Sequence, residues 1–193
     1  MKPLLVAALL VTIGTSVASS AAEAPPASRQ IAIAVQAAPE KERDACTVLG
    51  YDDTGKLVTL REGTNNLICL ADDPKLPGIS VACYEKGLEP FMRRGRDLRA
   101  EGKDDRTVFA TREAEVKAGT LKIPDKSILF VVTGTGVSPT GEIENRYLRY
   151  VIYIPYATPE STGIPKSPAG PGGPWLMDAG THHAHIMINP PRG

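Results

Sequence analysis

Two hydrophobic periods alternate along the chain, and they divide it into strand-like and helix-like regions. The first strand-like region contains β-rich apolar runs at 46–51, 56–61 and 66–70, separated by the turn sequences DDTG and EGTN. Short strands with turn residues at such close spacing are typical of antiparallel hairpins. The pattern predicts a three-stranded antiparallel meander.

The middle of the chain, residues 84–119, is charged and favours helix. Pro90 and Gly102 interrupt it, and Asp104 or Asp105 is placed to act as an N-cap, so we expect two helices. Acidic residues are interspersed among the arginines of this stretch, which indicates a solvated helix face and not a nucleic-acid-binding patch. The arginines concerned are Arg93, Arg94, Arg96 and Arg99.

Strand patterns return with KSILFVVTG, NRYLRYVIYIPYA and a closing region WLMDAGTHHAHIMINP. The segment TGTGVSPTGE, between the first two, contains a G-x-G after a hydrophobic strand, as dinucleotide-binding loops do. Its third glycine is misplaced and no helical pattern follows, so we expect a hairpin or a loop there.

The fold class follows from these regions together with the N-terminal segment RQIAIAVQAAP. Apolar residues at every second position of that segment favour a strand, whereas its alanine content favours a helix, and we expect a short helix. The sequence predicts a linker and short helix over 23–45. It then predicts a single α+β domain over 46–193, with an antiparallel sheet and two or three helices packed on one side or end.

The first residues have the character of a signal peptide. Met1 and Lys2 precede an apolar run of about ten residues and the small residues SVASSAAEA,. We expect a signal peptide over 1–22, cleavage after Ala22, and export to the periplasm or the extracellular space. No later apolar run approaches membrane-spanning length, so no membrane span is expected in the mature chain. The 22 basic and 22 acidic residues leave no net charge, which argues against a nucleic-acid partner,.

Three cysteines are present in the chain. In an oxidising compartment two of them are expected to pair. Cys69 and Cys83 bracket the turn-rich segment LADDPKLPGISVA, which favours a disulfide between them and leaves Cys46 unpaired. A Cys-x-x-Cys redox motif is absent from the sequence.

All three histidines lie in the segment GTHHAHIMINP. If this segment is a strand, His183 and His185 share one face and His182 points to the other. Side chains two residues apart are about 6.7 Å apart along a strand, a span that two imidazoles can close around one ion. Asp178 or a glutamate from another strand would have to complete a zinc or copper site. We expect surface or structural histidines and no cofactor, and the zinc or copper site is the alternative.

The signal peptide, AAPEKERDACTVL, REGTNNLICLADDP and the closing PWLMDAGTHHAHIMI together resemble a group of uncharacterised secreted bacterial proteins. The resemblance implies export and a shared fold, and it implies no activity. We expect a non-enzymatic module that binds a small molecule, a wall component or a protein. The alternative is a metal-dependent hydrolase or metal-binding protein using His183 and His185. The candidate contact aromatics of a binding module are Tyr147, Tyr150, Tyr153, Tyr156 and Trp175.

Overall fold

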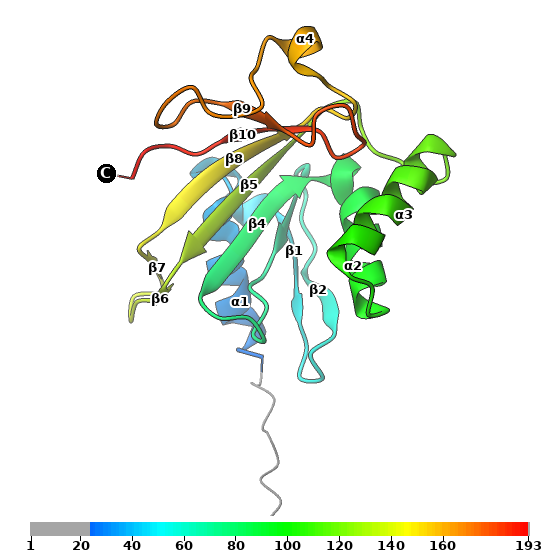
Figure 1. The fold of residues 1–193 in the computed structure, drawn as a ribbon. Coiled ribbons are helices and arrows are strands. Elements are labelled where there is room, and N and C mark those ends of the chain that lie inside the picture. Colours follow the sequence, from blue (N-terminus) through cyan, green and yellow to red (C-terminus); the bar gives the residue numbers. More distant parts are fainter. Residues whose placement is uncertain (1–23, 193) are drawn as a thin grey trace, which may run out of the picture.

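A computed structural model describes residues 24–192, and within them eight strands form one sheet. The predicted signal peptide, residues 1–22, lies outside the described residues. The strand order is β2-β1-β3-β4-β5-β8-β10-β9, and all neighbours are antiparallel except β1 and β3 (Figure 1). The strands are β1 (Thr47–Tyr51), β2 (Leu57–Arg61), β3 (Leu67–Leu70), β4 (Ile79–Glu85), β5 (Ser127–Gly134), β8 (Tyr147–Tyr153), β9 (Trp175–Met177) and β10 (His185–Ile188).

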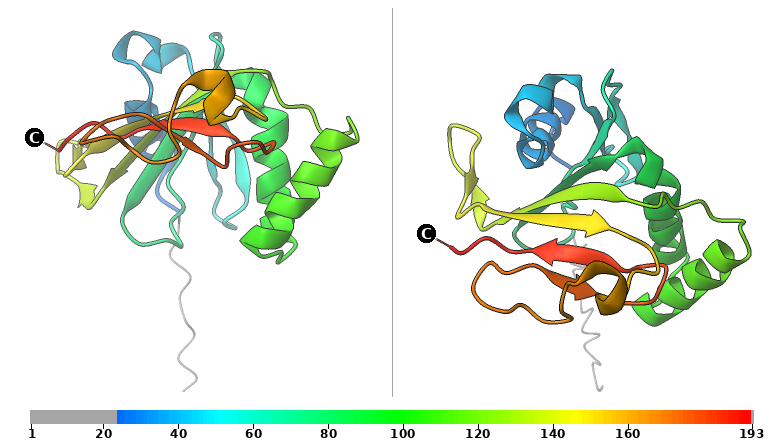
Figure 2. Two further views of the ribbon diagram at one scale, coloured as in Figure 1. Left: turned by 45° about the horizontal axis from the view of Figure 1, so that its top comes forward. Right: turned by 90° about the horizontal axis from the view of Figure 1, so that it is seen from above.

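Helices cover both faces of this sheet, so the prediction that they pack on one side or end was wrong. Helix α1 (Ala27–Ala34) and the short turn η1 (Val35–Ala37) lie on one face. Helices α2 (Glu89–Ala100) and α3 (Asp105–Lys117) pack against the other (Figure 1, Figure 2). Two faces need covering because strand residues of both parities are apolar along β4, β5 and β8,. Shorter helical elements are η2 (Glu40–Ala45), η3 (Lys86–Leu88) and α4 (Pro159–Thr162).

The hydrophobic core is divided by the sheet. On the α1 side, Ile33 and Ala34 pack against Val48, Val81 and Val132. On the α2 side, the buried cluster comprises Ile68, Tyr84, Leu88, Phe91, Leu129, Val151 and Tyr153. We refer to the sheet face that carries this second cluster as the α2 face. The α2 face is the one on which the histidine segment lies.

The early strands are connected differently from the predicted meander. Strands β1 and β2 form the expected hairpin, but β3 lies on the other side of β1 and runs parallel to it. The sequence did not predict strand β4, because the first half of ISVACYE belongs to the turn-rich segment with two prolines and a glycine. In the structure β4 is central, pairing with both β3 and β5. The sheet is therefore larger than expected.

Several local predictions are confirmed. The Asp104 side chain accepts a hydrogen bond from the Thr107 amide at 2.7 Å and so caps α3,. The two expected charged helices are α2 and α3, and Pro90 lies in the first turn of α2, where its missing amide hydrogen has no helical acceptor,. TGTGVSPTGE forms a hairpin whose short strands are β6 (Gly136–Val137) and β7 (Ile143–Glu144).

The cysteines also follow the prediction. Cys69 on β3 and Cys83 on β4 lie directly opposite one another and form a disulfide. Cys46 is free and buried, and burial raises the pKa of its thiol. Among residues 24–192, no helix has the length and apolar character needed to cross a membrane.

Candidate metal site

The candidate site lies at one end of the sheet, where β8 and β9 end and β10 begins. His185 is the first residue of β10 and pairs with Tyr153 of β8 and Met177 of β9. Asp178 directly follows β9, and His183 precedes β10 by two residues. The three side chains therefore come from the short connection between β9 and β10. The backbone pairing of these two strands fixes both ends of the connection.

Backbone hydrogen bonds hold this connection in place. The Thr181 carbonyl accepts from the Tyr156 amide at 2.7 Å, and the Gly180 amide donates to the Ala157 carbonyl at 2.8 Å. Asp178 has a φ of 50°, in the left-handed region that few residues other than glycine, asparagine and aspartate adopt,. The Asp178 carboxylate is thus displayed from a turn whose backbone is fixed by its neighbours.

Asp178 and His183 form a close pair. The Asp178 carboxylate accepts a hydrogen bond from His183 Nδ1 at 2.6 Å, and the side chains are 39% and 23% exposed. Burial lowers the pKa of His183 to about 4, and this effect outweighs the hydrogen bond to Asp178, which acts to raise it. His183 is therefore neutral at neutral pH, with Nδ1 protonated and Nε2 facing the Tyr153 hydroxyl at 3.3 Å.

His185 is fixed by its own backbone contact. Its Nδ1 lies 2.7 Å from the His183 carbonyl, which can only accept, so Nδ1 carries the hydrogen,. In the tautomer that carries its hydrogen on Nδ1, Nε2 has a lone pair. A hydrogen bond from one ring nitrogen to a carbonyl is the usual arrangement that orients a metal-binding histidine. His185 is 5% exposed, so its ring has little freedom to turn away.

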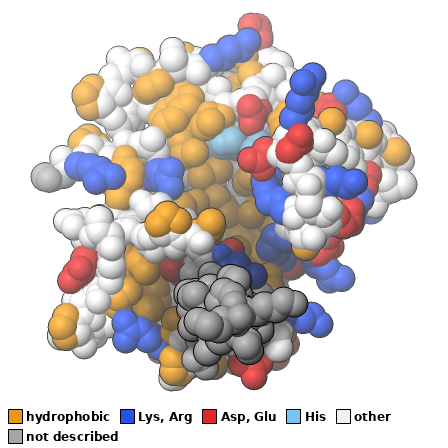
Figure 3. All heavy atoms as spheres, turned by 60° about the horizontal axis from the view of Figure 1, so that its bottom comes forward, with side chains coloured by type: hydrophobic (Ala, Val, Ile, Leu, Met, Phe, Trp, Pro, Cys, Tyr) orange, Lys and Arg blue, Asp and Glu red, His pale blue; other side chains and the backbone are white. Residues whose placement is uncertain are grey.

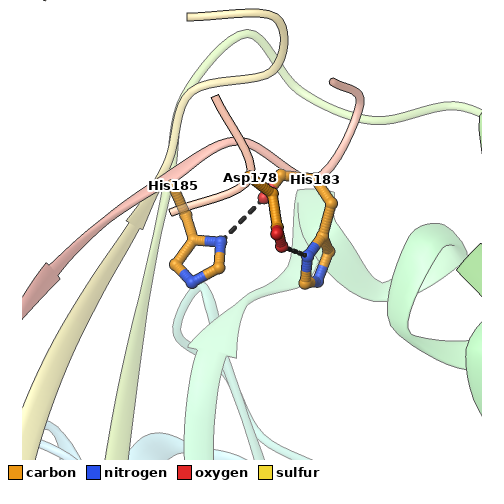
Figure 4. Close-up of side chains that lie close together, drawn as sticks. All are labelled: Asp178, His183 and His185. Carbon is orange, nitrogen blue, oxygen red and sulfur yellow. Dashed lines mark hydrogen bonds and ion pairs between the residues drawn. The ribbon is translucent and has the colours of Figure 1, made fainter. Parts of the chain in front are cut away.

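The three side chains converge. One ligand atom from each of Asp178, His183 and His185 lies within 4.8 Å of the other two. Figure 4 shows the Asp178 carboxylate between the two imidazole rings. Ligands of a tetrahedral ion with bonds of about 2.0–2.2 Å are separated by about 3.3–3.6 Å. In Figure 4 the Nδ1 side of each ring faces the carboxylate, so an ion at the centre of the group would displace the hydrogens that these nitrogens carry.

His182 does not point to the opposite face as strand parity predicted. The strand begins only at His185, so His182 belongs to the preceding turn and its ring lies 5.9 Å from that of His183. It is fully buried, and its Nδ1 makes a very short hydrogen bond to the Glu113 carboxylate of α3. The same Glu113 oxygen accepts from the His182 amide at 2.9 Å. His182 is thus outside the converging group because Glu113 holds it.

Two aromatic residues clamp this loop against the helices. Phe91 of α2 and Phe109 of α3 contact the rings of His182 and His183, with centroids 4.7–6.1 Å apart. Sequence reasoning missed Phe91, Phe109 and Glu113 as neighbours of the site. No local signal could have found Glu113, since it lies 69 residues before His182.

The five candidate contact aromatics do not form one surface. By strand register, Tyr147, Tyr153 and Trp175 lie on the α2 face, whereas Tyr150 lies on the opposite face against Phe130. Tyr156 follows the end of β8 and is 40% exposed. Tyr153 is 6% exposed and packs against Phe91, His183 and His185, so it belongs to the site.

Comparisons with protein-family models, with functionally described proteins and with solved structures find no match for this chain. Two imidazoles and one carboxylate are a donor set suited to zinc, copper and other divalent first-row ions.

Proposed function

We propose that this chain is an exported metal-binding protein that holds one divalent transition ion, Zn²⁺ or Cu²⁺, with Asp178, His183 and His185. The observation that carries the proposal is the convergence of three ligand atoms within 4.8 Å on a fixed loop. Two further observations support it. The His185 ring is 5% exposed and is held by its contact with the His183 carbonyl, and the Asp178 carboxylate lies between the two rings with His183 Nδ1 at 2.6 Å.

Binding would replace the proton that Asp178 and His183 share. Metal ions compete with protons for such ligands, so uptake releases protons and weakens as the pH falls. Three protein ligands leave at least one coordination position for water or for a substrate atom, as in catalytic zinc sites. Metal-assisted hydrolysis is therefore the activity that this donor set would support.

Isothermal titration of the untagged protein with ZnCl₂ and with CuCl₂ tests the proposal. We expect one ion per chain for the parent. Asp178→Asn and His185→Gln should each weaken binding at least tenfold. Asp125→Asn provides a matched control, because Asp125 is an exposed carboxylate outside the site, and it should bind as the parent does.

Thermal melting gives a second readout. An ion at a free concentration one hundred times its Kd stabilises the folded state by about 2.7 kcal/mol. For a chain of this size that corresponds to a rise of about 5–10 °C. A parent protein that binds neither ion, or a Kd unchanged in both site variants, would overturn the proposal.

A non-enzymatic binding module is the second candidate function, and the shape of the α2 face favours it. Figure 3 shows a hollow whose floor is lined by hydrophobic side chains, with charged side chains around it and histidine surface at one end. A hollow of this kind is typical of sites for ligands with apolar parts.

A further inference from the structure

Helices α2 and α3 leave part of the α2 face uncovered. One row of cross-strand neighbours, Tyr84, Leu129 and Val151, is buried beneath the helices. The next row is half-buried and runs across five adjacent strands, each member directly opposite the next. We call it the open row, and it consists of Leu49, Leu70, Ala82, Val131 and Arg149.

Arg149 is the only charged residue of the open row, and within residues 24–192 the structure gives it no ion pair and no hydrogen bond. Its Nε is enclosed and unpartnered. Because Ile188 pairs with Tyr150, the register brings Asn189 next to Arg149, and the Asn189 Oδ1 atom is also enclosed and unpartnered. The terminal nitrogens of Arg149 are not enclosed.

Buried or half-buried charges normally have an ion-pair or hydrogen-bond partner, and this guanidinium among apolar side chains has neither. Arginine presents a planar fork of donors that matches a carboxylate. The apolar members of the open row extend away from it in one direction. A ligand complementary to this surface therefore has an anionic head and a linear apolar tail.

We propose that the open row binds a long-chain carboxylate, with the carboxylate on Arg149 and the alkyl chain lying across Val131, Ala82, Leu70 and Leu49. Neighbouring strands are about 4.8 Å apart, so the row spans about 19 Å, which is the length scale of an extended fatty acid. This inference does not depend on the metal site.

Fluorescence titration with cis-parinaric acid tests the proposal. Trp175 is the only tryptophan of the chain and lies on the same face, two strands from Arg149, so it can transfer energy to the bound polyene. We expect saturable binding by the parent, one molecule per chain, and displacement by oleate. Oleyl alcohol, which lacks the charge, should displace the probe at least tenfold less effectively.

Arg149→Gln should weaken probe binding about tenfold or more, because it removes charge-assisted hydrogen bonds. Arg93→Gln is the matched control, since Arg93 is exposed on α2 and away from the open row. Val131→Asp should also weaken binding, by placing a carboxylate beside the ligand. Circular dichroism checks that each variant is folded.

Chelation by EDTA and the His185→Gln change separate this proposal from the metal site, because neither should alter the Kd for the probe. Absence of saturable binding by the folded parent would overturn the proposal, as would equal Kd values for the parent and Arg149→Gln. Binding of an acidic protein segment in place of the fatty acid, without displacement by oleate, would also overturn it.

Discussion

Replacing Glu113 by alanine tests how the histidine loop is held to α3. Glu113 accepts hydrogen bonds from the amide and from Nδ1 of His182, whose side chain is fully buried. The variant leaves both donors without an acceptor. Each buried donor left unsatisfied costs about 1–3 kcal/mol. Because the Glu113 side chain is 19% exposed, water can partly reach the two donors in the variant, and we expect a combined loss of about 2–4 kcal/mol,.

The lowered pKa of Glu113 gives a second value for the contribution of its carboxylate to stability. Burial of the carboxyl raises its pKa, but hydrogen bonds from Lys117 and His182 outweigh burial and lower the pKa from 4.5 to about 2. A decrease of that size corresponds to about 3 kcal/mol of stabilisation by the ionised form. This value includes the pair with Lys117 as well as the hydrogen bonds from His182, so it is an upper bound for the His182 contacts and is of the same order as the loss of about 2–4 kcal/mol,.

Urea unfolding at pH 7, followed by circular dichroism, measures the effect. Lys117→Ala is the control, because Lys117 is 65% exposed and its pair with Glu113 contributes about 0.5 kcal/mol or less,. We expect Glu113→Ala to lose about 2–4 kcal/mol. A loss below about 0.5 kcal/mol, or an equal loss in the Lys117 variant, would refute the reasoning.

The pH dependence has a defined sign. Since the folded-state pKa of Glu113 is lower than its unfolded value, its stabilisation is fully present above pH 4.5 and disappears as the pH falls towards 2,. The difference in stability between the parent and Glu113→Ala should shrink over that range. A difference that stays constant from pH 5 to pH 2.5 would contradict the assignment.

Three further predictions concern other parts of the chain. Replacing Cys69 and Cys83 together by alanine opens a loop of 14 residues and should cost about 3 kcal/mol in urea unfolding, whereas an unchanged midpoint would argue against the disulfide,. Gly63→Ala should cost about 2–3 kcal/mol or more, because its Cβ would lie 2.1 Å from the Thr47 amide nitrogen,. The control Gly87→Ala, with no atom within 4 Å, should be near neutral, and equal losses would contradict the packing argument. Mass spectrometry of exported protein should find a first residue at Glu23, or between Ala21 and Pro25, and an intact Met1 would exclude cleavage.

The sequence predicts features that depend on neighbouring residues better than features that depend on distant ones. The Asp104 cap of α3 and the β6–β7 hairpin are set by turn residues within a few positions, and both are found. The turn-rich segment before Cys83 correctly suggested its pairing with Cys69. The same segment prevented the prediction of β4, because its prolines and glycine indicate a loop and the strand ISVACYE begins directly after them.

Pairing between distant segments could not be predicted. The parallel contact of β1 with β3 depends on how the sheet is assembled, and no residue of either strand encodes it,. At the candidate site, the sequence grouped Asp178, His183 and His185 as possible ligands, and one ligand atom of each lies within 4.8 Å of the other two. Strand parity itself does not apply to His183, because the strand begins at His185. Parity also failed for His182, whose position is set by Glu113, 69 residues away on α3.

Anomalous diffraction at the zinc edge, from crystals of the untagged protein grown with one equivalent of Zn²⁺, tests the metal site most directly. The account predicts one strong peak per chain, bonded to the Asp178 carboxylate and to the imidazoles of His183 and His185 at about 2.0–2.2 Å. No peak at this loop, or a peak bonded only to other side chains, would contradict it.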